Sequence, residues 1–256
     1  MADNESGITL WRFVGCTMLY LALFLLVALP QWMIMCLYAK GIMAFTITCF
    51  FISFGLLVII HMVEALKYAR PFNFIAIIIC YELLTLGAAS FLLEWNLICA
   101  IIIMCVALLA LVIVLVISVF LIWIGFYGNP FKLAVVGAMG FVLAYCIEVM
   151  DIVQGWYFWQ DVAVSVFIAS VIILLISHLL ITYENFEFLV KDDALLIATV
   201  LYIGYLLILI AGRISAFYIS ENAAYFNTTT TEGYDDVDDD DDDDDKKRKI
   251  TVKSFE

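Results

Sequence analysis

The stretch YENFEFLVKDDALLIATVLYIGYLLILI, residues 183–210, begins with a short acidic segment and continues as an uninterrupted apolar run. Four carboxylates precede that run: Glu184, Glu187, Asp192 and Asp193. A glycine, Gly204, lies in the middle of it. The run extends to residue 213 and so matches the roughly 20 residues that a helix needs to cross a bilayer. This stretch predicts a membrane-spanning helix with carboxylates at its entrance.

The composition places the chain among integral membrane proteins. Hydrophobic residues make up 66% of the 256 residues, charged residues only 14%, and the mean hydropathy is +1.10. These values lie far outside the range of soluble proteins. Several spans of roughly 20 residues each leave no room for a sizeable soluble domain. We therefore expect any function to reside in or between membrane helices.

Apolar runs recur along the chain between short charged or turn-rich breaks. Seven runs are long enough to cross a bilayer as helices: 13–38, 41–63, 72–93, 97–124, 133–153, 161–182 and 194–213. They are continuous, whereas barrel strands need segments of about ten residues with alternating hydrophobicity. Because the breaks are short, consecutive helices should be antiparallel neighbours. The sequence predicts an all-α integral membrane protein, a bundle of seven transmembrane helices.

Charged residues set the expected boundaries and orientation. We expect a short cytosolic tail at residues 1–12, a seven-span membrane domain at 13–213, and a disordered acidic tail at 214–256. The N-terminus is predicted to be cytosolic because most basic residues near the membrane fall on that side. These are Arg12, Lys67, Arg70, Lys132 and Lys191.

The side of the membrane that bears the C-terminal tail stays open. Seven full spans place the tail in the lumen or outside the cell, where Asn227 of the tripeptide NTT is a glycosylation acceptor. A re-entrant seventh segment leaves the tail cytosolic and Asn227 unmodified. The oligomeric state also stays open.

The net charge of -13 is concentrated in the tail, since residues 221–256 hold 13 acidic and 5 basic residues. Such an acidic segment argues against nucleic acid or anionic lipid as a partner. The expected partners are the lipid bilayer and other membrane proteins. All seven cysteines lie in apolar runs without a CxxC pair, so we interpret them as small buried hydrophobes. We expect no metal site in the chain and no cofactor.

Glu82 lies near the middle of the apolar run 72–93, where an ionised carboxylate is costly. It is either protonated or paired with Arg70, His61 or another helix. A structural hydrogen bond and an ion path are equally open interpretations.

Three further polar residues lie in the later apolar runs. Glu148 and Asp151 are three residues apart and therefore share a helix face. They either form part of a proton or cation path, or are hydrated at the membrane interface. His178 is the third candidate, as a basic or polar partner for an acid.

Enzyme signatures are not found in the sequence. It has no GxSxG, HExxH, Walker loop or dinucleotide fingerprint. Intramembrane hydrolases need paired aspartates, a Ser/His pair or a metal site, and only Glu148 with Asp151 approaches such a set. We expect that the protein is not an enzyme.

Three segments carry a resemblance to a known family. RPFNF followed by ELLTLGAAS spans residues 70–90, NPFKL spans 129–133, and TYENFEFLVKDDALLIATVLYIGYLLILI spans 182–210. In this order they resemble the transmembrane Bax inhibitor motif family, particularly its Lifeguard and viral seven-span branches. The resemblance covers about residues 10–213.

The resemblance implies a seven-helix bundle with a calcium leak path, located in the endoplasmic reticulum, Golgi or plasma membrane, and a role in limiting cell death. In the family two C-terminal acids form a pH-sensitive latch over the path. Glu184 takes the place of the first acid, whereas Gly204 stands at the second position. A glutamate and a glycine cannot titrate as a coupled pair. Either Asp151, Asp192 or Asp193 substitutes, or the path is not gated by pH, or conduction is lost.

Two functions therefore stay open. The first is a regulator of cell death and calcium homeostasis with calcium as the transported ion. It requires water access to four acids: Glu82, Glu148, Asp151 and Glu184. The second is a non-conducting membrane adaptor that alters the trafficking of partner membrane proteins, which in a viral protein would serve immune evasion. It requires intact helices and tail, while the acids are replaceable.

Overall fold

The computed structural model describes residues 9–38, 43–63, 71–92, 97–125, 128–154, 159–190 and 193–228. Within these ranges the chain forms seven long α-helices and one 3₁₀ turn and has no β-strand. They are α1 (Leu10–Tyr38), α2 (Met43–Met62), α4 (Phe72–Leu92), α5 (Leu97–Ile124), α6 (Pro130–Gln154), α7 (Gln160–Glu184), η1 (Phe186–Phe188) and α8 (Asp193–Thr228). The predicted all-α fold is confirmed.

Each predicted apolar run coincides with one of the long helices. Six of them are long and apolar enough to cross a membrane: α1, α4, α5, α6, α7 and α8. Helix α2 offers only a shorter apolar segment, Ala44–Ile60. The six spans fit an integral membrane protein, and a seventh crossing by α2 stays a prediction.

Helix α8 extends beyond the predicted end of the membrane domain. The boundary was expected at residue 213, but α8 continues to Thr228. No glycine or proline occurs between Gly212 and Gly233, so nothing in this segment interrupts the helix. The chain divides into two compact units, Met1–Tyr218 and Ile219–Glu256. The aspartate run of the expected tail lies outside the described residues.

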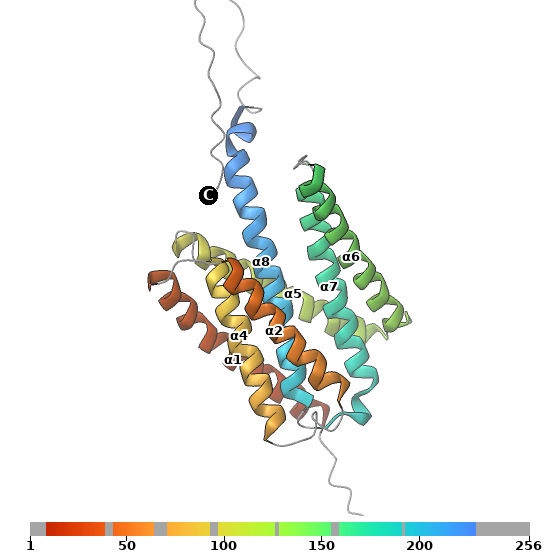
Figure 1. Cartoon of the computed structure of the whole chain (residues 1–256). Helices are drawn as coiled ribbons and strands as arrows, with labels where there is room; N and C mark the ends of the chain where they lie inside the picture. Colours follow the sequence, from red (N-terminus) through yellow and green to blue (C-terminus); the bar gives the residue numbers. More distant parts are fainter. Residues whose placement is uncertain are drawn as a thin grey trace, which may run out of the picture. The chain divides into compact units, whose positions relative to one another are not determined.

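In the first unit α8 is the most enclosed of the spans. Of its most apolar window 72% is buried, against 11% for α6. Helices α1 and α2 both pack on α4, whereas α5 and α6 pack on α7. Figure 1 shows α8 passing between the group of α1, α2 and α4 and the pair of α6 and α7. The inward side chains form one core, which includes Leu84, Leu111, Leu175 and Leu201.

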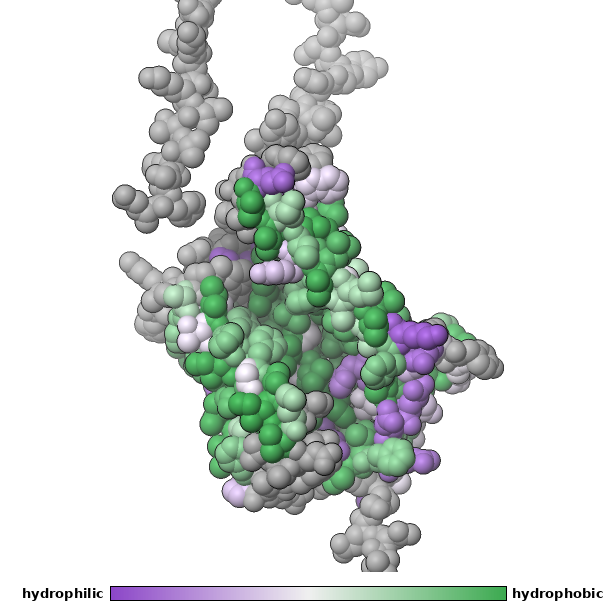
Figure 2. Space-filling view, turned by 45° about the vertical axis from the view of Figure 1, so that its right-hand side comes forward, coloured by the Kyte–Doolittle hydropathy of each residue, from purple (hydrophilic) through white to green (hydrophobic). Residues whose placement is uncertain are grey.

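The outer surface of the helices is mostly apolar. Large side chains such as Phe51 in α2, Trp123 in α5 and Met139 in α6 are largely exposed. Figure 2 shows hydrophobic residues over most of one face. An apolar surface of this extent is unusual for a soluble monomer but is what hydrocarbon covers in a bilayer.

The close approach of α7 and α8 depends on Gly204. A Cβ atom at this position would lie 2.5 Å from Cδ2 and 2.6 Å from Cδ1 of Leu175 in α7, far inside van der Waals contact. Small residues let membrane helices approach closely in this way. The glycine in the middle of the apolar run is therefore explained by helix packing.

The substitution Gly204→Ala should lower the thermal unfolding temperature of the detergent-solubilised protein, because overpacking a core typically costs about 1–3 kcal/mol. Gly55→Ala is the matched control, since a Cβ at Gly55 in α2 meets nothing within 4 Å. That variant should be neutral or slightly stabilised, because alanine is the better helix former. Equal unfolding temperatures for Gly204→Ala and the wild type would contradict the close contact.

Candidate functional site

The structure distributes the predicted acids over several helices. Glu82 lies in α4, Glu148 and Asp151 lie in the second half of α6, Glu184 ends α7 and Asp193 begins α8. The acids therefore occupy separate environments, which have to be considered one at a time.

Four other candidates cannot be placed as side chains. Arg70 and Asp192 lie outside the described residues. The backbone of His61 belongs to α2 and that of Asn227 to α8, but the side chains of both lie outside the described part.

The two positions of the expected latch are not brought together. Gly204 contacts Leu175, whereas the exposed Glu184 lies nine residues further along α7. At 1.5 Å per residue this separation is roughly 13 Å along the helix. Because Leu175 fills the space beside Gly204, position 204 has no room for the carboxylate that the latch requires.

Asp193 has a local structural role at the start of α8. Its carboxylate Oδ2 accepts a hydrogen bond from the backbone N–H of Val190 at 2.9 Å, and its own N–H donates to the Val190 carbonyl at 2.9 Å. The side chain is buried. A negative charge in the first turn also interacts favourably with the helix dipole. These contacts assign Asp193 to the turn before α8.

Glu82 is half-buried and bonded to another helix, which was one of the alternatives predicted for it. The amide Nε2 of Gln31 in α1 donates to Glu82 Oε2 at 3.1 Å and to Oε1 at 3.4 Å. Within the described residues, Gln31 is its one hydrogen-bond partner and no basic side chain forms an ion pair with it. The carboxylate thus lies inside a membrane span with only a neutral donor beside it.

One turn further along α4, the buried Thr85 joins three helices. The indole Nε1 of Trp32 in α1 donates to the Thr85 carbonyl at 2.9 Å. The Thr85 hydroxyl donates to the Tyr81 carbonyl at 2.7 Å and lies 2.8 Å from the hydroxyl of Tyr202 in α8. A threonine hydroxyl has a single hydrogen, so Tyr202 is the donor in the second bond.

An aromatic cluster, formed by Phe24, Trp32, Tyr81, Tyr202 and Tyr205, surrounds this group. The rings of Phe24 and Tyr81 stack with centroids 4.5 Å apart, and those of Tyr81 and Tyr202 lie 5.1 Å apart. The Tyr81 hydroxyl donates to the Phe24 carbonyl at 2.7 Å. Offset aromatic pairs contribute about 0.5–1.5 kcal/mol beyond their buried area. The cluster fixes α1, α4 and α8 relative to one another.

Sequence reasoning identified Glu82 but missed its surroundings. Four functional neighbours were not predicted: Gln31, Trp32, Thr85 and Tyr202. Their signal was the presence of amide, indole and hydroxyl groups inside apolar runs, where such groups bond across helices.

Asp151 is the least satisfied acid of the described chain. Its side chain is 4% exposed, and neither Oδ1 nor Oδ2 has a hydrogen-bond partner among the described residues. Glu148, one turn earlier, is half-buried. Hydration at the membrane interface, which was one interpretation of this pair, does not describe a carboxylate enclosed to this degree.

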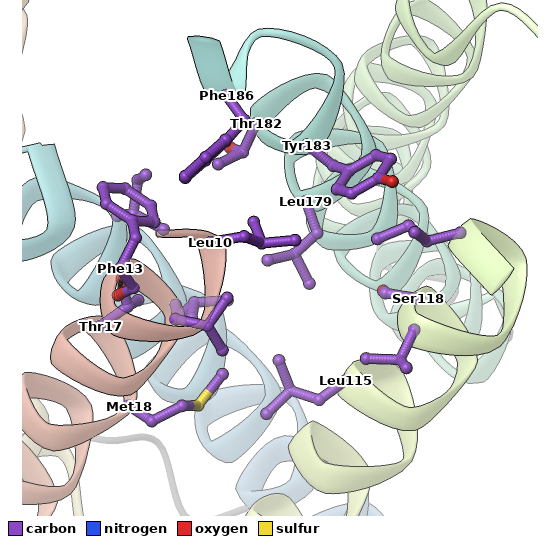
Figure 3. Close-up of a pocket in the computed structure, with 15 residues that line it drawn as sticks. Leu10, Phe13, Thr17, Met18, Leu115, Ser118, Leu179, Thr182, Tyr183 and Phe186 are labelled. Atoms are coloured by element: carbon purple, nitrogen blue, oxygen red, sulfur yellow. Dashed lines mark hydrogen bonds between the residues drawn. The ribbon is translucent and has the colours of Figure 1, made fainter. Parts of the chain in front are cut away.

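A cavity of about 140 Å³ lies between α1, α5, α7 and α8 (Figure 3). Three hydroxyl groups line it, those of Thr17, Ser118 and Thr182. Each donates to a carbonyl of its own helix, that of Thr182 to His178 at 2.8 Å. Most of the lining is aliphatic or aromatic, so the cavity suits an apolar group and not an ion. His178 is half-buried beside it in α7.

Comparisons with protein-family models, with curated proteins and with solved structures find no match. Membership in the Bax inhibitor motif family therefore stays a prediction. Among the described residues no group of three or more His, Cys, Asp or Glu side chains is placed to hold a metal ion.

Removing the Tyr202 hydroxyl tests the contact between α4 and α8. Tyr202→Phe should destabilise the protein by about 1 kcal/mol, the usual net value of one hydrogen bond, measured by unfolding in mixed detergent micelles. Tyr145→Phe is the control, because Tyr145 in α6 is largely exposed. In a double-mutant cycle, Thr85→Val and Tyr202→Phe should be non-additive. Strict additivity would show that the two hydroxyls do not interact.

Proposed function

We propose that this protein is a multi-pass membrane regulator of calcium homeostasis and cell death, and that calcium leaks along a path containing Glu82. The observation that carries the proposal is the environment of Glu82. Its carboxylate lies inside a membrane span with the Gln31 amide as its one hydrogen-bond partner in the described chain. Intramembrane carboxylates are costly and mark ion or proton pathways.

Oxygen chemistry around Glu82 supports calcium as the ion. Calcium is a hard cation that takes carboxylate, carbonyl and water oxygens. Besides the Glu82 carboxylate, the same part of the bundle contains the hydroxyls of Tyr81, Thr85 and Tyr202. A neutral amide donor leaves the negative charge of Glu82 available to a passing cation, whereas a lysine or arginine partner would neutralise it.

The packing of Gly204 bears on gating. Two adjacent carboxylates sharing a proton would give a steep pH response. With Leu175 against Gly204 and Glu184 exposed at the end of α7, this pair is missing. The proposed leak is therefore not closed by a two-acid latch, and Glu184 is dispensable for it.

A non-conducting membrane adaptor is the second candidate, and the exposure of α6 favours it. Helix α6 packs on α7, and only 11% of its most apolar window is buried. Phe131, Val135 and Met139 lie exposed along it. Such a face can bind the helix of another membrane protein as well as lipid. The adaptor uses this face and needs no ion path.

Calcium release from liposomes containing the purified protein distinguishes the two candidates. Glu82→Gln keeps the shape of the side chain and its bond with Gln31 but removes the charge. A unit charge about 4 Å from a cation contributes several kcal/mol at an effective dielectric constant near 20, so the leak should slow by about tenfold or more. Glu184→Gln is the matched control and should leak like the wild type.

Two results would contradict the leak. One is a Glu82→Gln variant that leaks as fast as the wild type. The other is wild-type protein, shown to be folded and inserted, that releases calcium no faster than empty liposomes between pH 5 and 8. The second result would favour the adaptor.

A further inference from the structure

The end of α6 and the start of α7 enclose a cavity of about 350 Å³. Seven residues line it: Cys146, Ile147, Met150, Asp151, Gln154, Trp159 and Val162. Asp151 supplies a carboxylate and Gln154 an amide. A volume of this size holds several water molecules, since one water needs only about 10–15 Å³ of such space. The cavity can therefore contain a hydrated ion.

The state of Asp151 indicates that something outside the described chain belongs in this cavity. The side chain is 96% enclosed, and both carboxylate oxygens lack a hydrogen-bond partner among the described residues. Burying an unpaired carboxylate costs several kcal/mol. A bound cation would compensate for this cost by supplying the missing charge and the missing contacts to oxygen.

The neighbouring groups favour a divalent cation. Glu148 lies one helical turn before Asp151, where two like charges repel each other. A cation with two charges relieves this repulsion and the burial cost of Asp151 together. The donors that the helix presents on successive turns are the oxygens of Glu148, Asp151 and Gln154, and hard cations prefer such ligands. Calcium accepts irregular coordination completed by water, whereas magnesium requires a nearly ideal octahedron.

We propose that Asp151 is the principal ligand of a calcium site at the α6–α7 end of the bundle. Glu148 adds negative charge from the neighbouring turn, and water completes the coordination. Because the site has two carboxylates, its affinity lies at the weak end of calcium sites, with a Kd of about 10⁻⁴–10⁻³ M. Binding here is an equilibrium property and does not depend on a leak through Glu82.

Terbium luminescence tests the site in the full-length protein in detergent micelles. Terbium(III) replaces calcium and emits when a nearby excited tryptophan transfers energy to it. Trp159 lines the cavity. The acidic segment 221–256 contains no tryptophan, so selective tryptophan excitation reduces the contribution of ions bound there. Wild-type protein should give a terbium signal that excess calcium displaces.

Three variants locate the ion. Asp151→Asn should weaken terbium binding by at least about tenfold, because even indirect partners of a metal ligand are worth 10–100-fold. Glu148→Gln should weaken it less. Trp159→Phe should lower the emission intensity without moving the midpoint of calcium displacement. Glu94→Gln is the control, since it removes a carboxylate adjacent to another tryptophan, Trp95.

The outcomes separate this site from other sources of signal. An unchanged midpoint in Asp151→Asn overturns the proposal, and so does a shift of equal size in Glu94→Gln. If Asp151→Asn does not fold, the midpoint of Glu148→Gln and the intensity of Trp159→Phe decide. Either of these two being equal to the wild-type value overturns the proposal. Liposome flux is a separate readout, so a failed leak leaves this result standing.

Discussion

The two oxygen atoms of Thr85 hold three helices at one depth in the bundle. Its carbonyl accepts the Trp32 indole from α1, and its hydroxyl accepts the Tyr202 hydroxyl from α8. Hydrocarbon offers no substitute for these bonds, so sliding or rotating any of the three helices would leave polar atoms unpaired. Glu82 lies one turn away on the same helix. The contacts that align the bundle therefore also hold the carboxylate against Gln31.

The contact between α7 and α8 imposes a second constraint, and it acts on function by exclusion. Leu175 occupies the space that any side chain at position 204 would need. Close helix packing and a second latch acid compete for the same volume, and this chain uses it for packing. Loss of the acid at this position is thus more than the loss of a charge, because α7 and α8 would have to separate before one could be restored.

Composition alone was enough to predict the helices, because each span is a continuous apolar run. The end of α8 was not predicted correctly, since the acidic composition after residue 221 was interpreted as the end of order, although no helix breaker occurs before Gly233. Glu82 was found because a carboxylate within an apolar run is visible in the sequence. Gln31 and Thr85 were not assigned as partners, because helices that are apolar on all sides give no periodicity to show which face meets which neighbour.

The same limit applies to the acids of α6, for which the sequence gave spacing but not environment. Two carboxylates in spans differ here in what satisfies them. Glu82 accepts an amide from a helix of the same core, whereas Asp151 has no such partner in the described chain. They also belong to different packing groups, α4 with α1 and α2, and α6 with α7. A carboxylate held by its own protein can face a transient ion, while one left unsatisfied beside a cavity is stabilised only by a ligand that stays.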